Sequence, residues 1–71
     1  MEIKDAIRQI RKELYLSQEA FARELHVGFT AVNRWENGHT RPNQIARHAI
    51  LELCAKKNLS QELINVFIAS K

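Results

Sequence analysis

A polar stretch in the middle of the sequence, VGFTAVNRWENG, combines an aromatic ring with amide, hydroxyl and guanidinium groups. If the stretch is helical, one face collects the side chains whose positions step by one, three, one and three residues, namely Phe29, Thr30, Asn33, Arg34 and Asn37. An Asn amide can form two hydrogen bonds with an adenine edge, an Arg guanidinium can bind guanine or a phosphate, and Thr and Phe can touch a thymine methyl group. This face therefore has the chemistry to read DNA, whereas Val32, Trp35 and Glu36 point the other way, toward the interior.

Phe29 stands at the start of this polar helix, where an aromatic ring is expected to be exposed. A thymine methyl group or a sugar would cover the ring in a complex with DNA. Alternatively, the ring folds back against the neighbouring helix as an outlying core residue, since single apolar residues at a surface are common.

The sequence lacks the residue combinations that a catalytic site or a metal site would need. The three His residues are scattered at His26, His39 and His48, and the single Cys, Cys54, lies six positions after His48, which does not place the two on one helix face. The sequence contains no CxxC, HxxxH or HExxH pair, the usual spacings of metal ligands, and no Gly-rich phosphate loop. Cys54 lies among apolar residues, which is typical of a small core side chain. We therefore expect no enzyme, no metal and no cofactor.

Composition favours a small domain of residues 1–71. A hydrophobic content of 45% is enough for one core. The single Cys excludes an internal disulfide and fits a reducing compartment. No apolar run is long enough to span a membrane, and the first residues, MEIKDAIRQ, lack the apolar core of a signal peptide. The net charge is +3, and the basic excess follows the polar stretch, which can attract phosphate weakly. We expect a soluble, cytoplasmic domain.

Apolar residues recur at helical spacing throughout, and no segment alternates long enough to be a strand. The sequence predicts an all-α, compact five-helix bundle. Its first helix carries Ile3, Ile7, Ile10 and Leu14, and its second runs from about Gln18 to Leu25 behind the N-cap Ser17. The third extends from the cap Gly28 to Asn37 and Gly38. The fourth begins at the cap Asn43 and ends near Asn58, and the fifth begins at the cap Ser60. The predicted inner faces of these last two are Ile45, Ala46, Ala49, Ile50 and Leu53, and Leu63, Ile64, Phe67 and Ile68.

The second and third helices are separated by three residues, and such a pair is the αα unit that DNA-binding proteins use most. The segment SQEAFARELHVGFTAVNRWENGHTRP resembles the helix-turn-helix of the phage repressor and Cro-like (XRE) family, with the motif at about residues 17–38. The positions that carry the resemblance are Gln18, Ala22, Val32, Trp35, Glu36, Asn37 and Gly38. Three positions depart from the family. His26 and Tyr15 stand where Gly is common, and Gly28 stands where Ser or Thr is common. A residue other than Gly in the left-handed region costs about 1 kcal/mol.

The resemblance implies a lambda-repressor-like fold whose recognition helix, at about residues 29–37, enters the major groove. Phe29, Thr30, Asn33 and Arg34 would then reach base edges. Phosphates would be held by Gln18, at the amino end of the first motif helix, and by Asn37, Thr40 and Arg41 beyond the recognition helix. Taken alone, Arg41 could equally be a solvated loop cation. The resemblance also implies that Glu36 turns inward and pairs with Arg11.

The function implied is sequence-specific binding of double-stranded DNA as a transcriptional regulator, more specifically a repressor. A homodimer on a near-palindromic operator is expected, because one recognition helix makes few base contacts. Two alternatives remain, an antitoxin-type module that binds a toxin and controls its own operon, and the DNA-binding part of a longer chain. The last helix, QELINVFIASK, would carry a dimer or partner surface, or would simply close the core.

Overall fold

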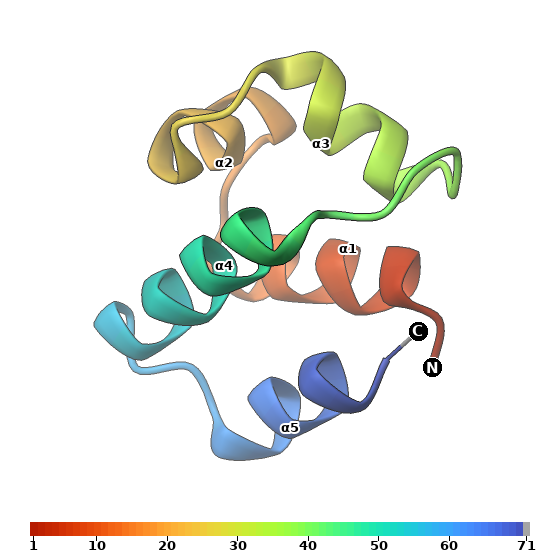
Figure 1. Cartoon of the computed structure of the whole chain (residues 1–71). Helices are drawn as coiled ribbons and strands as arrows, with labels where there is room; N and C mark the ends of the chain where they lie inside the picture. Colours follow the sequence, from red (N-terminus) through yellow and green to blue (C-terminus); the bar gives the residue numbers. More distant parts are fainter. Residues whose placement is uncertain (71) are drawn as a thin grey trace.

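The computed structural model describes residues 1–70, which form five helices connected by short loops (Figure 1). The helices are α1 (Ile3–Glu13), α2 (Gln18–Leu25), α3 (Phe29–Glu36), α4 (Gln44–Lys56) and α5 (Gln61–Ala69). Figure 1 shows α2 and α3 packed together at one end of the molecule, α1 and α4 in the middle, and α5 at the other end. The predicted all-α, five-helix architecture is confirmed. No helix among residues 1–70 is long and apolar enough to cross a membrane.

Side-chain caps define where three of the helices begin. The Oγ of Ser17 accepts a hydrogen bond from the backbone N–H of Ala20 at 3.1 Å, and the Oγ of Ser60 does the same for Leu63 at 3.2 Å. The Oδ1 of Asn43 accepts from the backbone N–H of Ala46 at 2.9 Å. Each cap satisfies a backbone donor that has no partner inside its helix. The predicted caps are therefore confirmed, and Gly28 caps α3 without a side chain.

Four helix ends share one device, a residue in the left-handed region at Tyr15 (φ 58°), His26 (φ 58°), Gly38 (φ 76°) and Asn58 (φ 57°). After each of them, the next backbone N–H reaches back to a carbonyl five residues earlier, as Val27 does to Ala22 at 3.0 Å and His39 does to Arg34 at 2.9 Å. These bonds satisfy orphan carbonyls at the helix ends. Only Gly38 adopts this conformation freely, so His26 and Tyr15 hold their turns at a cost of about 1 kcal/mol each.

The core lies where α1 packs between α3 and α5, and α4 packs against α2. Its buried apolar side chains are Ile3, Ala6, Ile7, Ile10, Phe21, Ala22, Leu25, Val32, Trp35, Ala46, Ile50, Leu53, Cys54 and Phe67. Trp35 is 5% exposed and belongs to this core, as its spacing predicts. Burial raises the pKa of the Cys54 thiol to about 11, so the group stays protonated and packs as a small hydrophobe.

Two residues that the sequence places inside are in fact outside. Ile45 is 81% exposed and Ile68 is 53% exposed. On each helix the neighbouring residue is buried instead, Ala46 on α4 and Phe67 on α5. Successive residues of a helix are turned by about 100°, so burying one directs the next toward solvent. The apolar faces of α4 and α5 are wider than the faces that the bundle buries. The sequence pattern alone therefore counts Ile45 and Ile68, at the edges of these faces, as buried.

Candidate nucleic-acid interface

The helix pair α2–α3 is joined at His26, Val27 and Gly28, and the left-handed conformation of His26 lets α3 start at a sharp angle to α2. The two helices pack on one another, so the amino end of α2 lies against the surface of α3. The exposed residues of α3 lie at the end of the molecule that α2 and α3 form (Figure 1). This arrangement leaves one side of α3 accessible at the surface.

The outward face of α3 is the one that its spacing predicts. Thr30, Arg34 and Asn37 are exposed, Asn33 is half-buried beside α2, and Phe29 is 48% exposed. Phe29 is not among the buried and partly buried apolar residues that form the core, and its exposure favours the first interpretation, in which the ring is left at the surface. Val32, Trp35 and Glu36 lie on the opposite, buried face.

Glu36 is 2% exposed and pairs with Arg11 of α1. The Nε of Arg11 lies 2.7 Å from Oε2 of Glu36, and its Nη2 lies 2.9 Å from Oε1, so the predicted contact is bidentate. The Nη1 of Arg11 also donates to the carbonyl of Leu16 at 3.0 Å. Arg8 adds a second cation, with its Nε 3.7 Å from Oε1 of Glu36 and its Nη2 donating to the Glu36 carbonyl at 2.9 Å.

The charge state of Glu36 results from opposing effects. Burial alone would raise the pKa of this carboxyl group, but hydrogen bonds from Arg11 and Gln18 and the charges of Arg11 and Arg8 outweigh it, so the pKa is lowered. The bond to Glu36 likewise raises the pKa of Arg11. The pair therefore stays ionised, and its acidic member is withdrawn from the outward face of α3.

Three amide side chains extend from this ion pair to the outward face. The Nε2 of Gln18 donates to Oε1 of Glu36 at 3.1 Å, and the Oε1 of Gln18 accepts from Nδ2 of Asn33 at 3.3 Å. The Oδ1 of Asn33 in turn accepts from Nδ2 of Asn37 at 3.1 Å. The sequence does not predict the link between Gln18 and Asn33, because it depends on the angle between α2 and α3 and not on spacing within either helix.

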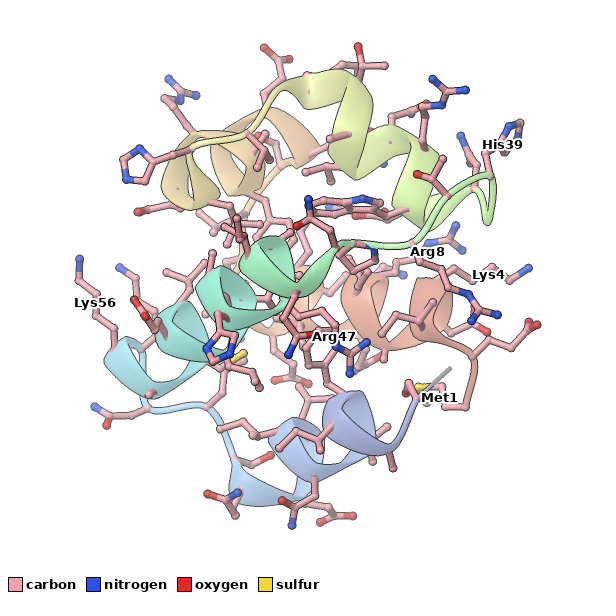
Figure 2. All side chains as sticks on the ribbon, viewed as in Figure 1. Met1, Lys4, Arg8, His39, Arg47 and Lys56 are labelled. Atoms are coloured by element: carbon pink, nitrogen blue, oxygen red, sulfur yellow. The ribbon has the colours of Figure 1, made fainter. Side chains whose placement is uncertain are left out.

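The loop after α3 carries Thr40 and Arg41, both exposed. Two cations of α1 that the sequence pattern does not predict as site residues also lie near this end of α3. Arg8 binds the last carbonyl of the helix, and the side chain of Lys4 packs over Gly38, where an added Cβ would lie 3.3 Å from its Cδ. Figure 2 shows Lys4 and Arg8 on the same side of the molecule as His39. Their signal in the sequence is a spacing of four residues, which puts them on one face of α1.

The other basic residues of the fourth-helix region do not gather at this surface. The Arg47 guanidinium lies over the ring of Phe67 at 5.0 Å from its centroid, between α4 and α5. Lys56 lies at the far end of α4 (Figure 2). The basic residues that follow the polar stretch are therefore spread over the molecule, and of Arg41, Arg47 and Lys56 only Arg41 stands in the loop after α3. Among residues 1–70 no three potential metal ligands lie together.

The geometry of a capped helix pair with a polar outward face agrees with the comparison with protein families, in which the profile described as helix-turn-helix matches residues 7–46. The chain belongs to the Cro/C1-type helix-turn-helix family. This helix-turn-helix domain is a DNA-binding one, consistent with a transcriptional regulator, and its family is not enzymatic.

A curated relative is the HTH-type transcriptional activator BcrR of Enterococcus faecalis, which is 40% identical over 43 residues. The match covers 61% of this chain and 21% of the relative, so it spans about a fifth of the relative's length. No solved structure matches the chain significantly.

Proposed function

We propose that this helix-turn-helix domain binds specific double-stranded DNA sequences, with α3 in the major groove, and represses transcription by occupying a promoter. The observation that supports this most is the division of α3 into two faces. Its outward face offers amide, hydroxyl and guanidinium groups, and its only acidic residue, Glu36, is buried and paired with Arg11. An exposed carboxylate at this point would repel the phosphates.

Base reading is assigned to Phe29, Thr30, Asn33 and Arg34. Asn33 and Arg34 stand in the middle of the face, where a major-groove edge is within reach, and each suits a bidentate contact, to adenine and to guanine respectively. Phe29 is 48% exposed in the free protein, which leaves an apolar surface for a thymine methyl group.

Phosphate binding is assigned to residues on both sides of this face. Gln18 stands at the amino end of α2, where helix N–H groups attract anions, and Asn37, Thr40 and Arg41 follow the end of α3. The second N–H of the Gln18 amide stays free for a phosphate, because only one is needed for Glu36. Lys4 and Arg8 would widen the positive surface at the carboxyl end of α3.

Binding as a homodimer is part of the proposal, because a single α3 presents too few base-reading side chains for high specificity. A twofold dimer would hold its two recognition helices about 34 Å apart, one turn of B-DNA. The exposed Ile45 supplies an apolar surface for it, beside a groove that adjoins the recognition helix and is lined by Val27, Ala31 and Ala49.

The experiment is selection of binding sites from a pool of random duplexes, followed by a footprint of the selected site. We expect one enriched near-palindrome whose halves are one helical turn apart. A pool that stays random after several rounds would reject specific binding. A reporter gene with the selected site over its promoter then gives the direction of regulation, repression as proposed. The relative BcrR is called an activator, and an increase in reporter expression would assign that direction instead.

A further inference from the structure

We propose that the buried Arg11–Glu36 pair sets the direction of the hydrogen-bond chain that runs through Gln18 to Asn33 and Asn37, so that Gln18 is a positioning residue for the amide of Asn33. The inference rests on the proposed role of Asn33 in reading bases. It concerns which way this amide faces, and it therefore bears on which base is preferred.

The chain starts at Glu36 because an ionised carboxylate can only accept hydrogen bonds. Its Oε1 receives the Nη2 of Arg11 at 2.9 Å and the Nε2 of Gln18 at 3.1 Å. The amide of Gln18 must therefore turn its nitrogen toward Glu36 and its oxygen away. A flipped Gln18 would place its oxygen against the carboxylate, which loses a charge-assisted bond and adds repulsion.

The orientation of Gln18 then determines that of the next two amides. Its oxygen can only accept, so Asn33 must offer its nitrogen, at 3.3 Å, and must turn its oxygen toward Asn37. Asn37 completes the chain by donating its Nδ2 to that oxygen at 3.1 Å. Every bond in the chain donates toward Glu36, and reversing Asn33 alone would bring like groups together at both of its ends.

The chain leaves Asn33 with the groups that an adenine edge requires. Its nitrogen has two N–H groups and uses one for Gln18, and its oxygen has two lone pairs and uses one for Asn37. One donor and one acceptor of the Asn33 amide remain free, and their relative positions are already fixed in the protein without DNA. The N7 acceptor and N6 donor of adenine have a fixed order too, so a flipped amide at the same helix position would fit adenine worse.

The substitution that tests this is Gln18→Met, which keeps the length of the side chain and removes the amide. It is compared on the selected operator, on versions of that operator changed at one base pair, and on scrambled DNA. We expect Gln18→Met to lose roughly tenfold of the preference at the base pair that Asn33→Ala also affects, the usual size of one bidentate contact. The double variant should lose no more preference there than Asn33→Ala alone, because Gln18 acts through Asn33.

The matched control is Gln61→Met on α5. Gln61 likewise bonds to an Asn amide, because its Nε2 donates to Oδ1 of Asn65 at 3.0 Å, but the one buried charged side chain among residues 1–70 is Glu36, which is not part of that pair. This variant should bind every DNA as the unchanged protein does. Thermal melting of all variants ensures that binding differences do not come from unfolding.

Two results would overturn the inference. If Gln18→Met weakens binding to operator and scrambled DNA by the same factor, and if its effect multiplies with that of Asn33→Ala, then Gln18 is a phosphate contact only. If Gln18→Met leaves all base preferences unchanged, it positions nothing. Both results require that the unchanged protein prefers its operator, whereas absence of that preference would instead reject the proposed function.

Discussion

The α2–α3 and α4–α5 regions each contain an amide pair four residues apart, and the two pairs have different consequences. Asn37 donates to Asn33 at 3.1 Å on α3, and Gln61 donates to Asn65 at 3.0 Å on α5. The first pair is linked by hydrogen bonds through Gln18 to the buried carboxylate of Glu36, whereas both residues of the second pair are exposed. The orientation of the amide pair on α3 is therefore set by the buried Glu36 carboxylate, whereas the amide pair on α5 is only a surface contact.

Charged side chains show the same contrast. Arg11 is bidentate to a buried carboxylate behind α3, and Arg47 lies over the ring of Phe67 between α4 and α5. A buried ion pair holds its members in one geometry and is expensive to break, whereas a partly exposed cation over a ring contributes little. The domain concentrates its orienting interactions behind the helix that we assign to DNA reading.

The largest expected effect comes from breaking the buried pair. Arg11→Met leaves the carboxylate of Glu36 without its main partner, and removing one member of such a pair costs ~3–5 kcal/mol. We expect about 3 kcal/mol of lost unfolding free energy, because Arg8 and Gln18 still contact the carboxylate. Arg47→Met in the other region should cost about 0.5–1 kcal/mol. Urea unfolding at neutral pH measures both, and equal losses would remove the contrast between the regions.

The contribution of Glu36 should also depend on pH. Its pKa is lower in the folded protein than in the unfolded chain, so the stability it provides is complete above its unfolded pKa, about 4.3, and is lost as the pH falls through the folded pKa. In Arg11→Met, burial should instead raise the pKa of the Glu36 carboxyl group. Lowering the pH then protonates the buried carboxylate and reduces the loss of unfolding free energy in that variant. We therefore expect the gap in unfolding free energy between the two proteins to narrow from pH 7 to pH 3.5. A gap that stays constant would mean that Glu36 does not carry the effect.

The two exposed isoleucines distinguish the surfaces available for a dimer. Ile45→Lys places a charge beside the groove that adjoins α3, and we expect it to weaken binding to a full operator by about tenfold, or ~1.4 kcal/mol, while leaving binding to a half-site unchanged. Ile68→Lys, on α5, should change neither the binding to the full operator nor the binding to the half-site. Gel shifts with full and half sites measure both variants. The reverse outcome would move the dimer surface to α5.

The smallest effect concerns the turns. His26 and Asn58 have nearly equal positive φ values, 58° and 57°, in the α2–α3 and α4–α5 connections. Asn tolerates this region better than His, so His26→Gly should stabilise the fold by up to ~1 kcal/mol and Asn58→Gly by less. Thermal melting should rank the two variants in this order. A loss of stability on His26→Gly would show that the His side chain contributes more than its backbone costs.

The sequence predicted the elements well because their signals are local. Ser17, Asn43 and Ser60 cap helices through bonds that span three residues, and Gly38 ends α3 with a positive φ. The partnership of Arg11 with Glu36 is not local, and only the family resemblance implied it. Local patterns failed where tertiary packing decides between neighbours, so that Ala46 is buried and Ile45 is not, and Phe67 is buried and Ile68 is not.

The candidate site was predictable in its side-chain types and less so in its connections. The outward face of α3 follows from helical spacing within the nine residues 29–37. The bond from Asn33 to Gln18, and the approach of Lys4 and Arg8 to the end of α3, require the angles between helices. No spacing within one helix determines those angles, because they result from how the whole bundle packs.

The most direct test of the account is a set of DNA titrations with Asn33→Ala and Arg41→Ala, on the selected operator and on scrambled DNA, at two salt concentrations. Asn33→Ala should cost about 1–3 kcal/mol on the operator and relax the preference at one base pair. Arg41→Ala should weaken binding to both DNAs about equally and reduce the salt slope by about one for each lost phosphate contact. Asn65→Ala, in the amide pair of α5, is the control and should change nothing. If Asn33→Ala weakens both DNAs equally while Arg41→Ala affects only the operator, the docking is reversed, and if neither variant changes binding, α3 is not the DNA-reading helix.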